Sequence, residues 1–304
     1  YVCNYYGKDW GFCISHDKLV NLQSGNYHCF IDSEHKPGNL NYADLIIKGN
    51  SDKEVLISTY ICHPSMANNE LSGPTVATAL ALWLQSQDKL HYTYRFVFVP
   101  ETIGSIAYIN LNINHLKEKV VAGFNLTCIG DDRTYSFLPT RKGDTISDRV
   151  AIKSLQDLVE IFDHYTWFDR GSDERQYCAP GVDLPIASIM RSKYGTYPEY
   201  HTSLDNLEFV TPSGLYGGFK AVQYAIFILE TNFFPVSNVM CEPFLTKYNL
   251  IDTISFRTNL KSFSRLLLDI TSIADGYNDL LQISESIGVK YVNVVEAVNI
   301  LTDA

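Results

Sequence analysis

Apolar residues in the middle of the chain form short runs that alternate with longer periodic segments. The run Val55–Cys62 is nearly continuous, as is typical of a central parallel strand, because both faces of such a strand are buried. The alternation predicts further strands at 92–99, 120–128 and 184–190, and helices at 74–84, 103–113, 147–164 and 213–231. We therefore predict an α/β fold whose mostly parallel sheet carries helices on both faces.

The two ends of the chain differ from this middle part. Residues 1–50 mix aromatic and β-branched residues with turn formers, which indicates a small β domain. The sheet is expected to close near residue 235, so 51–235 is the predicted α/β domain. Helices are predicted in 236–304 at 263–274, 279–287 and 291–301, with tight glycine turns between them, and they indicate a winged-helix-like domain.

The net charge of the chain limits the kinds of binding partner that are expected. The chain has 304 residues, with 34 acidic and 24 basic side chains and a net charge of -10, which disfavours nucleic acid and anionic membranes. The tail from residue 258 is itself acidic, so a packing or protein-contact role is predicted for it rather than DNA binding.

The cysteines and the apolar stretches indicate in which cellular compartment the protein is expected. The seven cysteines are scattered without a CxxC pair, which favours reduced thiols in the cytoplasm. No apolar stretch reaches the roughly 18 residues of a membrane span. The chain opens at Tyr1 rather than Met, without a basic and apolar leader, which is expected of a trimmed or incompletely supplied product.

Candidate metal ligands follow several predicted strands. His63 ends the first apolar run, and His201 lies in a loop near the end of the sheet domain. Glu70, Glu101 and Asp173 are carboxylates at strand ends or in the loops that follow. Each alone also fits an ordinary solvated side chain. Together they predict a hydrolytic zinc site, which needs imidazole or carboxylate ligands and a carboxylate that takes a proton from water.

The order of these motifs resembles a known family. His63, the segment 69–73, Glu101 with Gly104 and Ser105, the segment 171–174 and the segment 200–205 follow the order found in zinc-dependent aminopeptidases, which include bacterial leucyl aminopeptidases and glutamate carboxypeptidase. More closely, the whole chain is similar to bacterial aminopeptidase-like proteins found with polysaccharide-biosynthesis functions. That resemblance implies a small β domain, an aminopeptidase-like domain and a winged-helix tail.

The chain departs from this family at acidic positions. The resemblance implies a bridging aspartate where Asn69 stands, a second glutamate where Thr102 stands and a metal-binding aspartate where Thr127 stands. A two-zinc centre is therefore not expected. We predict a single zinc ion held by His63 and His201, with Glu70 and Asp173 as carboxylate ligands and Glu101 as the general base. Glu70 also fits a helix-start residue that complements the dipole.

Three further residues are candidates for substrate binding. Arg191 and Tyr200 flank a loop and are predicted to hold a substrate carboxylate or an oxyanion, although a surface loop with an internal ion pair is also consistent with the pattern. His16 is a candidate lid residue or an ordinary structural histidine.

These observations predict a metal-dependent amide or peptide hydrolase of aminopeptidase type that acts on a small peptide or amide. One alternative is a non-catalytic binding protein on the same scaffold, because neutral residues replace the acidic ligands. Another is a deacylase or amide-processing enzyme that acts on an amino sugar or glycan precursor, which only the resemblance suggests.

Overall fold

The structure is a computed structural model that describes residues 10–12, 14–32, 34, 36–63, 65–248, 250 and 263–303. Two compact units are present. The first comprises the described residues up to Ala151 together with Ile161–Val222, and the second comprises Ile152–Glu160 together with the described residues from Gln223 onward. Helices α4 and α6 each contribute residues to both units. The candidate ligands all belong to the first unit.

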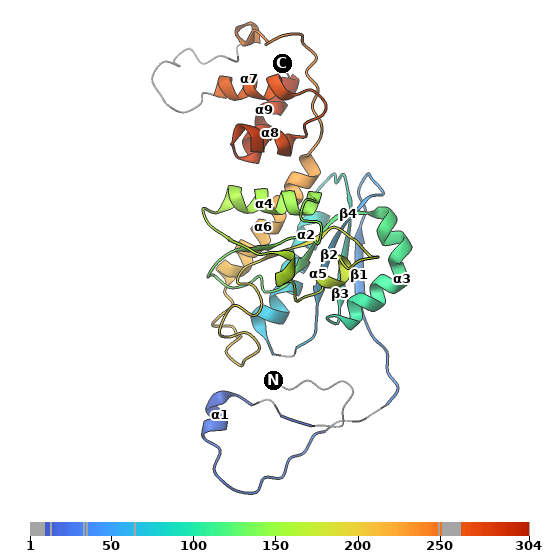
Figure 1. The fold of residues 1–304 in the computed structure, drawn as a ribbon, viewed down its shortest axis with the longest axis vertical. Helices are drawn as coiled ribbons and strands as arrows, with labels where there is room; N and C mark the ends of the chain where they lie inside the picture. Colours follow the sequence, from blue (N-terminus) through green and yellow to red (C-terminus); the bar gives the residue numbers. More distant parts are fainter. Residues whose placement is uncertain are drawn as a thin grey trace. The chain divides into compact units, whose positions relative to one another are not determined.

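The elements follow one another in the order strand, helix, strand through most of the first unit (Figure 1). Their bounds are α1 His16–Val20, β1 Ala43–Ile47, β2 Glu54–Tyr60, a π-helical turn Ala67–Leu71, α2 Ser72–Gln85, β3 Thr93–Val99, α3 Ile103–Lys119, β4 Val120–Leu126, β5 Ser136–Leu138, α4 Ile146–Leu158, β6 Asp163–His164, a 3-10 turn Trp167–Asp169, α5 Glu174–Tyr177, β7 Ile186–Met190, α6 Pro212–Thr231, a 3-10 turn Leu245–Tyr248, α7 Phe263–Ile273, α8 Leu280–Ile287 and α9 Tyr291–Asp303.

The strands form one seven-stranded sheet in the order β1-β3-β2-β4-β7-β5-β6. Strands β3, β2, β4 and β7 are parallel to one another, whereas β1 and β5 run antiparallel to their neighbours β3 and β7. Every residue of β2 is buried, and Val55, Leu56 and Ile57 have no exposed surface. This confirms the prediction of a mostly parallel sheet, in which β2 is an interior strand between β3 and β4.

Helices cover both faces of the sheet. The chain moves from β2 to β3 in one direction and from β3 to β4 in the other, so right-handed crossovers put α2 and α3 on opposite faces. On one face, α3 and α5 share a buried cluster with Leu56 of β2 and Val97 of β3. On the other face, Trp83 of α2 contacts Phe219 of α6, with ring centroids 6.4 Å apart.

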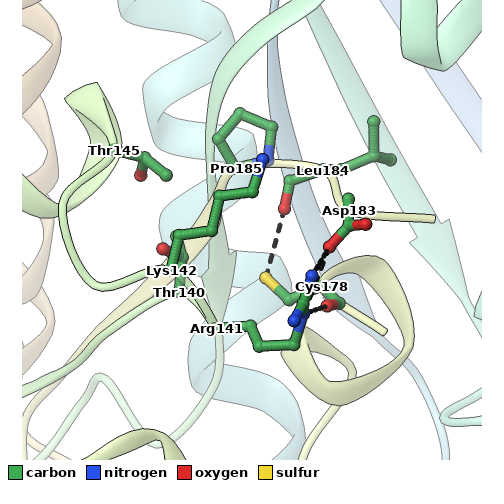
Figure 2. A pocket seen from close by; sticks show the side chains of 8 residues that line it. All are labelled: Thr140, Arg141, Lys142, Thr145, Cys178, Asp183, Leu184 and Pro185. Atoms are coloured by element: carbon green, nitrogen blue, oxygen red, sulfur yellow. Dashed lines mark hydrogen bonds and ion pairs between the residues drawn. The ribbon is translucent and has the colours of Figure 1, made fainter. Parts of the chain in front are cut away.

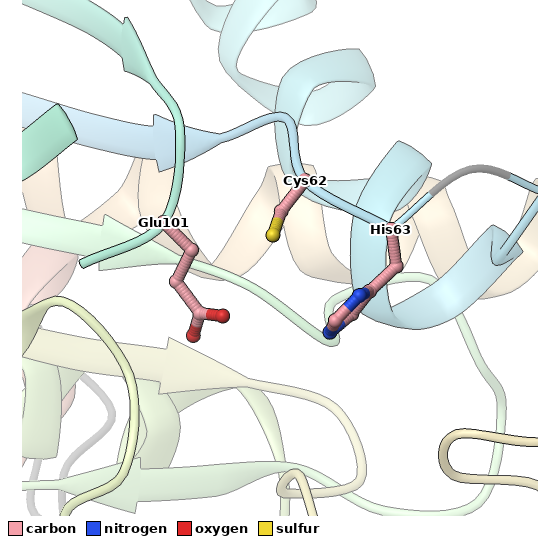
Figure 3. Close-up of side chains that lie close together, drawn as sticks. All are labelled: Cys62, His63 and Glu101. Carbon is pink, nitrogen blue, oxygen red and sulfur yellow. The ribbon is translucent and has the colours of Figure 1, made fainter. Parts of the chain in front are cut away.

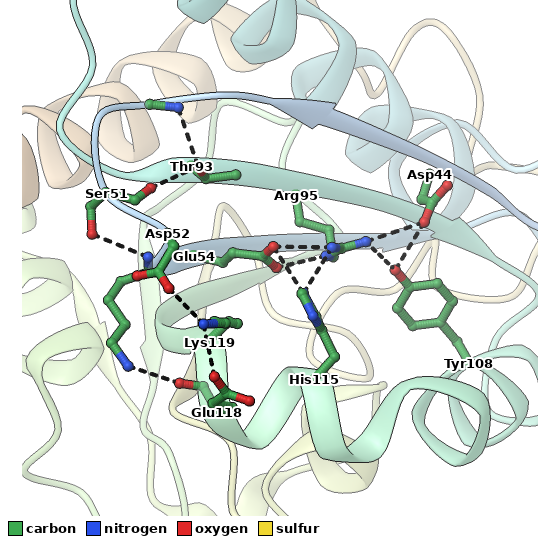
Figure 4. Close-up of polar contacts among 12 residues, drawn as sticks. Asp44, Ser51, Asp52, Glu54, Thr93, Arg95, Tyr108, His115, Glu118 and Lys119 are labelled. Atoms are coloured by element: carbon green, nitrogen blue, oxygen red, sulfur yellow. Dashed lines mark hydrogen bonds and ion pairs between the residues drawn. The ribbon is translucent and has the colours of Figure 1, made fainter.

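A charged network joins the edge strand β1 to the sheet (Figure 4). Arg95 of β3 donates two hydrogen bonds to Glu54 of β2, at 2.7 and 3.0 Å, and pairs with Asp44 of β1 at 3.3 Å. Tyr108 and His115 of α3 complete it through Asp44 and Glu54. The small β domain at 1–50 stays a prediction, since α1 and β1 are the elements described there and β1 belongs to the main sheet.

Two local features differ from the sequence pattern. The helix predicted at 147–164 ends at Leu158, and Asp163 and His164 pair with β5 as a short strand instead. A π-helical turn at Ala67–Leu71 precedes α2 and was not predicted. Gly73 allows this turn to pack closely, because a Cβ atom there would lie 2.4 Å from both the Leu126 carbonyl oxygen and the Thr59 hydroxyl.

The second unit contains the three helices predicted for the tail. Asp279 caps α8 by accepting a hydrogen bond from the backbone N–H of Gln282, and Gly288 ends it in the left-handed conformation. Within this unit, Asp157 at the end of α4 accepts hydrogen bonds from the Tyr224 hydroxyl at 3.0 Å and from the backbone N–H of Tyr291 at 2.7 Å.

Within the described part of the chain, no helix is both long and apolar enough to span a bilayer.

Candidate functional site

The site forms where β2 and β3 end. Tyr60 and Val99 are paired in register, so the residues that follow each strand emerge side by side at the carboxyl edge of the sheet. The side chains of Cys62, His63 and Glu101 converge there, and their potential ligand atoms all lie within 4.8 Å of one another (Figure 3). The predicted candidates His63 and Glu101 are therefore neighbours, and the structure adds Cys62 to them.

Glu70 supports this group from the π-helical turn. Its Oε2 atom accepts a hydrogen bond from the backbone N–H of Cys62 at 2.7 Å. Its Oε1 atom is buried and makes no hydrogen bond. Turns of the π type are frequent at functional sites. Glu70 thus fixes the loop that carries the site and still has one oxygen available.

Asp173 is bound to the turn that follows Glu101. Its Oδ1 atom accepts hydrogen bonds from the backbone N–H of Thr102 at 2.7 Å and from the Ser105 hydroxyl at 2.9 Å. Its Oδ2 atom is buried without a partner. Thr102 has a φ of 63°, a conformation that non-glycine residues rarely adopt, so the turn after Glu101 is strained.

His201 reaches the site from a distant loop. Its ring centroid lies 4.6 Å from that of His63, and Tyr200 stacks on its other side at 3.9 Å. Asp205 anchors this loop, because its two carboxylate oxygens accept hydrogen bonds from the backbone N–H groups of Asn68 and Asn69 at 2.6 and 2.9 Å. The same aspartate thereby ties the His201 loop to the turn that carries Glu70.

The carboxylates concentrate negative charge in a partly dry site. Burial raises the pKa of Glu70 and of Glu101 to about 7, and the charge of Asp173 acts in the same direction on both. Burial raises the pKa of Asp173 to about 6. The Cys62 residue is exposed, but its thiol turns toward Glu101 and His63, and desolvation together with the charges of Glu70 and Glu101 raises the pKa of this thiol to about 11.

Both imidazoles favour the neutral form that binds metal, since burial lowers the pKa of His63 and of His201. A divalent cation would relieve the repulsion among the carboxylates and satisfy the buried oxygens of Glu70 and Asp173. The donor atoms of Cys62, His63 and Glu101, which lie within 4.8 Å of one another, fit a bound metal ion, whereas His201, Glu70 and Asp173 offer donors outside that group.

Asn69 and Thr127, which stand where acidic residues were expected from the resemblance, are joined by hydrogen bonds through Tyr60. The amide of Asn69 donates to the Tyr60 hydroxyl at 2.7 Å, and that hydroxyl lies 2.6 Å from the Thr127 hydroxyl. All three side chains are buried. Uncharged groups thus pair with each other in this part of the site.

Two predicted substrate-binding residues lie outside the cluster. The Arg191 side chain donates to the Thr134 carbonyl at 2.7 Å and stacks over the Tyr135 ring at 3.9 Å, which buries it. His16 is exposed at the start of α1. Tyr200, by contrast, lies against His201.

A small pocket of about 120 Å³ lies at the opposite edge of the sheet (Figure 2). Its lining includes the loop after β5, which runs antiparallel to β7, and the residues just before β7. An ion pair between Arg141 and Asp183 occupies its charged side. The pocket is therefore separate from the cluster at the carboxyl edge.

The sequence pattern missed Cys62 and Asp205. Cys62 precedes His63 directly at a strand end, and this position was the available signal. Asp205 ends the segment 200–205, but its anchoring role has no local signal, because its partners lie 136 and 137 residues earlier in the chain.

The fold and the arrangement of the strand ends define an aminopeptidase-like protein. The solved aminopeptidase from Aneurinibacillus sp. strain AM-1 is 20% identical, with a TM-score of 0.51 over 62% of this chain and 47% of that one. A zinc aminopeptidase from Bacillus subtilis is 18% identical, with a TM-score of 0.52 over 62% of this chain and 49% of that one. At this identity the likeness concerns the fold.

Closer matches give the family. Residues 12–232 match the domain of unknown function DUF4910, and residues 234–304 match a winged helix-turn-helix domain. The chain belongs to the DUF4910 family. It is 35% identical over 302 residues to a Clostridium acetobutylicum protein named as a polysaccharide biosynthesis protein with an aminopeptidase-like domain, covering 99% of this chain and 69% of that protein.

A solved structure named as a peptidase from Clostridium acetobutylicum is 34% identical and has a TM-score of 0.89. The match covers 99% of this chain and 68% of that one. The predicted resemblance to aminopeptidase-like proteins with a winged-helix tail is thus confirmed.

Proposed function

We propose that this protein is a metal-dependent amide or peptide hydrolase of aminopeptidase type that uses one zinc ion. The observation that carries the proposal is the convergence of His63, His201 and the carboxylates at the carboxyl edge of the sheet, with the two imidazole rings 4.6 Å apart. His63 and His201 would hold the ion, and Glu70 and Asp173 each have one buried oxygen that could join them.

A bound zinc ion supplies Lewis acidity, which polarises an amide carbonyl and makes water a competent nucleophile near neutral pH. Glu101 stands next to the proposed ligands and accepts the proton from the attacking water at a carboxylate oxygen. It then delivers this proton to the leaving nitrogen. The neighbouring carboxylates favour a substrate with a free amino group, as expected for an aminopeptidase.

The neutral chain through Asn69, Tyr60 and Thr127 supports one ion rather than two. The Asn69 amide and the two hydroxyls offer no negative charge to a second cation, although the buried Oδ1 atom of Asn69 has no hydrogen-bond partner. These neutral residues also fit the alternative of a non-catalytic binding protein. The metal content of the purified protein distinguishes the hydrolase from the binding protein.

A second candidate substrate is the amide of an amino sugar. It is favoured by the 35% identity to a protein named for polysaccharide biosynthesis. Parallel assays with aminoacyl anilides and N-acylated amino sugars distinguish the two substrate classes.

Histidine variants test the metal site. We expect His63→Ala and His201→Ala to lose zinc, measured by elemental analysis after reconstitution and removal of excess metal. His115→Ala is the matched control, because this histidine pairs with Glu54 in the network of Figure 4. Equal zinc content in all three variants and the wild type would contradict the site, and a wild type without zinc would favour the binding protein.

A further inference from the structure

The sulfur of Cys62 lies in the middle of the candidate site. Cys62, His63 and Glu101 each offer one donor atom, and these atoms lie within 4.8 Å of one another. Figure 3 shows the thiol on the side of its loop that faces the Glu101 carboxylate and the His63 ring. Such spacing allows Cys62 and His63 to reach a common ion.

The surroundings of the sulfur also suit a metal-bound thiolate. The Glu101 carboxylate and the His63 ring face the sulfur, so a metal ion bound there would have oxygen and nitrogen donors beside the thiolate. Asp173 is fully buried, its Oδ2 atom has no partner, and its charge acts on both Cys62 and Glu101. A cation bound by Cys62 and His63 would also offset the negative charge of Asp173.

The other described thiols near this part of the fold have different surroundings. The Cys178 thiol is buried and donates to the backbone carbonyls of Leu184 and Ile186 at 3.2 Å. The Cys128 thiol is buried against Thr127 and the Tyr197 hydroxyl. Cys62 is exposed and faces carboxylates, so packing does not account for its position.

We propose that Cys62 is a thiolate ligand of the metal ion in this site, beside His63. The inference rests on the proposed function for the presence of the ion. On binding, the thiol loses its proton to solvent and a sulfur lone pair forms the bond to the metal, so nothing is oxidised or reduced. A thiolate makes the site selective for Zn²⁺ over Mg²⁺ and Mn²⁺, which prefer oxygen ligands.

Loading the full chain with Co²⁺ tests directly whether the metal ion is bonded to the Cys62 sulfur. Wild-type protein loaded with Co²⁺ should show a near-ultraviolet thiolate-to-cobalt absorption band, and Cys62→Ser should lack it. We expect the zinc affinity of Cys62→Ser, measured by competition with a chelator, to fall by about tenfold or more, since even outer-shell changes cost 10 to 100-fold. Cys241→Ser, at another exposed cysteine, is the matched control and should keep band and affinity.

A second measurement needs no variant. Zinc should protect Cys62 from alkylation by iodoacetamide in the wild type, and peptide mass spectrometry reads each cysteine separately. Cys29 is also exposed and should react equally with and without zinc.

The outcomes separate this inference from the function on which it rests. If Cys62 is alkylated at the same rate with zinc, or Cys62→Ser keeps the band, the ligand assignment is wrong. The proposed hydrolase then stands as long as His63→Ala still loses zinc. A wild type that binds neither zinc nor cobalt overturns both.

Discussion

Asp205 is the residue whose replacement best tests how the site is assembled. It has no exposed surface, and its two carboxylate oxygens accept the backbone N–H groups of Asn68 and Asn69. Asp205→Asn keeps the shape of the side chain but leaves one accepting oxygen. One buried N–H group then faces the amide NH₂ and has no acceptor.

The cost follows from these contacts. Hydrogen bonds to charged groups contribute about 1.5 to 3 kcal/mol, and a buried donor without a partner costs about 1 to 3 kcal/mol. Burial raises the pKa of Asp205, which means that burying its negative charge is unfavourable. The neutral asparagine avoids this unfavourable contribution, which offsets part of the loss. We therefore expect a loss of about 2 kcal/mol, which lowers the melting temperature of a unit of this size by about 4 to 8 °C.

Zinc binding should weaken as well, because the lost hydrogen bonds hold the His201 loop against the turn that carries Glu70. We expect the zinc affinity of Asp205→Asn to fall about tenfold or more. Thermal unfolding followed by circular dichroism and chelator competition are the two assays. Asp88→Asn, which makes the same chemical change at an exposed aspartate, should alter neither.

An unchanged melting temperature would show that the two hydrogen bonds do not contribute as argued. A lower melting temperature with wild-type zinc affinity would show that Asp205 stabilises the fold without positioning His201.

Two further predictions concern Glu101 and Glu54. Glu101→Gln should lower hydrolysis by a factor of roughly 10² or more while zinc stays bound, because the amide cannot accept the proton; full activity on added zinc would mean that Glu101 is a ligand instead. Burial alone would raise the pKa of Glu54, but hydrogen bonds from Arg95 and His115 outweigh it and hold the pKa below its usual value. The unfolded state therefore binds more protons, so this contribution to stability is present above about pH 4.5 and is lost as the pH falls through the folded pKa. Denaturant unfolding at several pH values should show Glu54→Gln less stable than wild type at pH 7, with the difference shrinking below pH 4.5; a constant difference would contradict the pairing.

The main elements were predictable because their patterns are local. Buried parallel strands need apolar side chains on both faces, and β2 and β4 show this directly in the sequence. The sequence pattern did not predict where α4 ends, because contacts with a distant part of the chain determine its end. Asp163 and His164 pair with β5, and that pairing replaces the helix that the local pattern favours.

The site was predictable where it depends on strand order and not where it depends on loops. His63 and Glu101 follow neighbouring strands, so their proximity comes from the sheet. Tyr200 could be placed beside His201 from sequence adjacency alone. Arg191 was assigned to substrate because it is charged and near the loop, yet Tyr135 and Thr134 bind its guanidinium elsewhere.

The distribution of charge also bears on the number of ions. Glu70, Glu101 and Asp173 bring three carboxylates together, and two of their buried oxygens have no partner. Asn69, Tyr60 and Thr127 bring only neutral groups, which hydrogen-bond to one another while the buried Oδ1 atom of Asn69 has no partner. Because a cation in a buried site needs negative charge near it, an ion at the carboxylates is compensated and an ion at the neutral chain is not. This asymmetry is why the replacement of acidic residues by Asn69 and Thr127 is compatible with one metal ion while it argues against two.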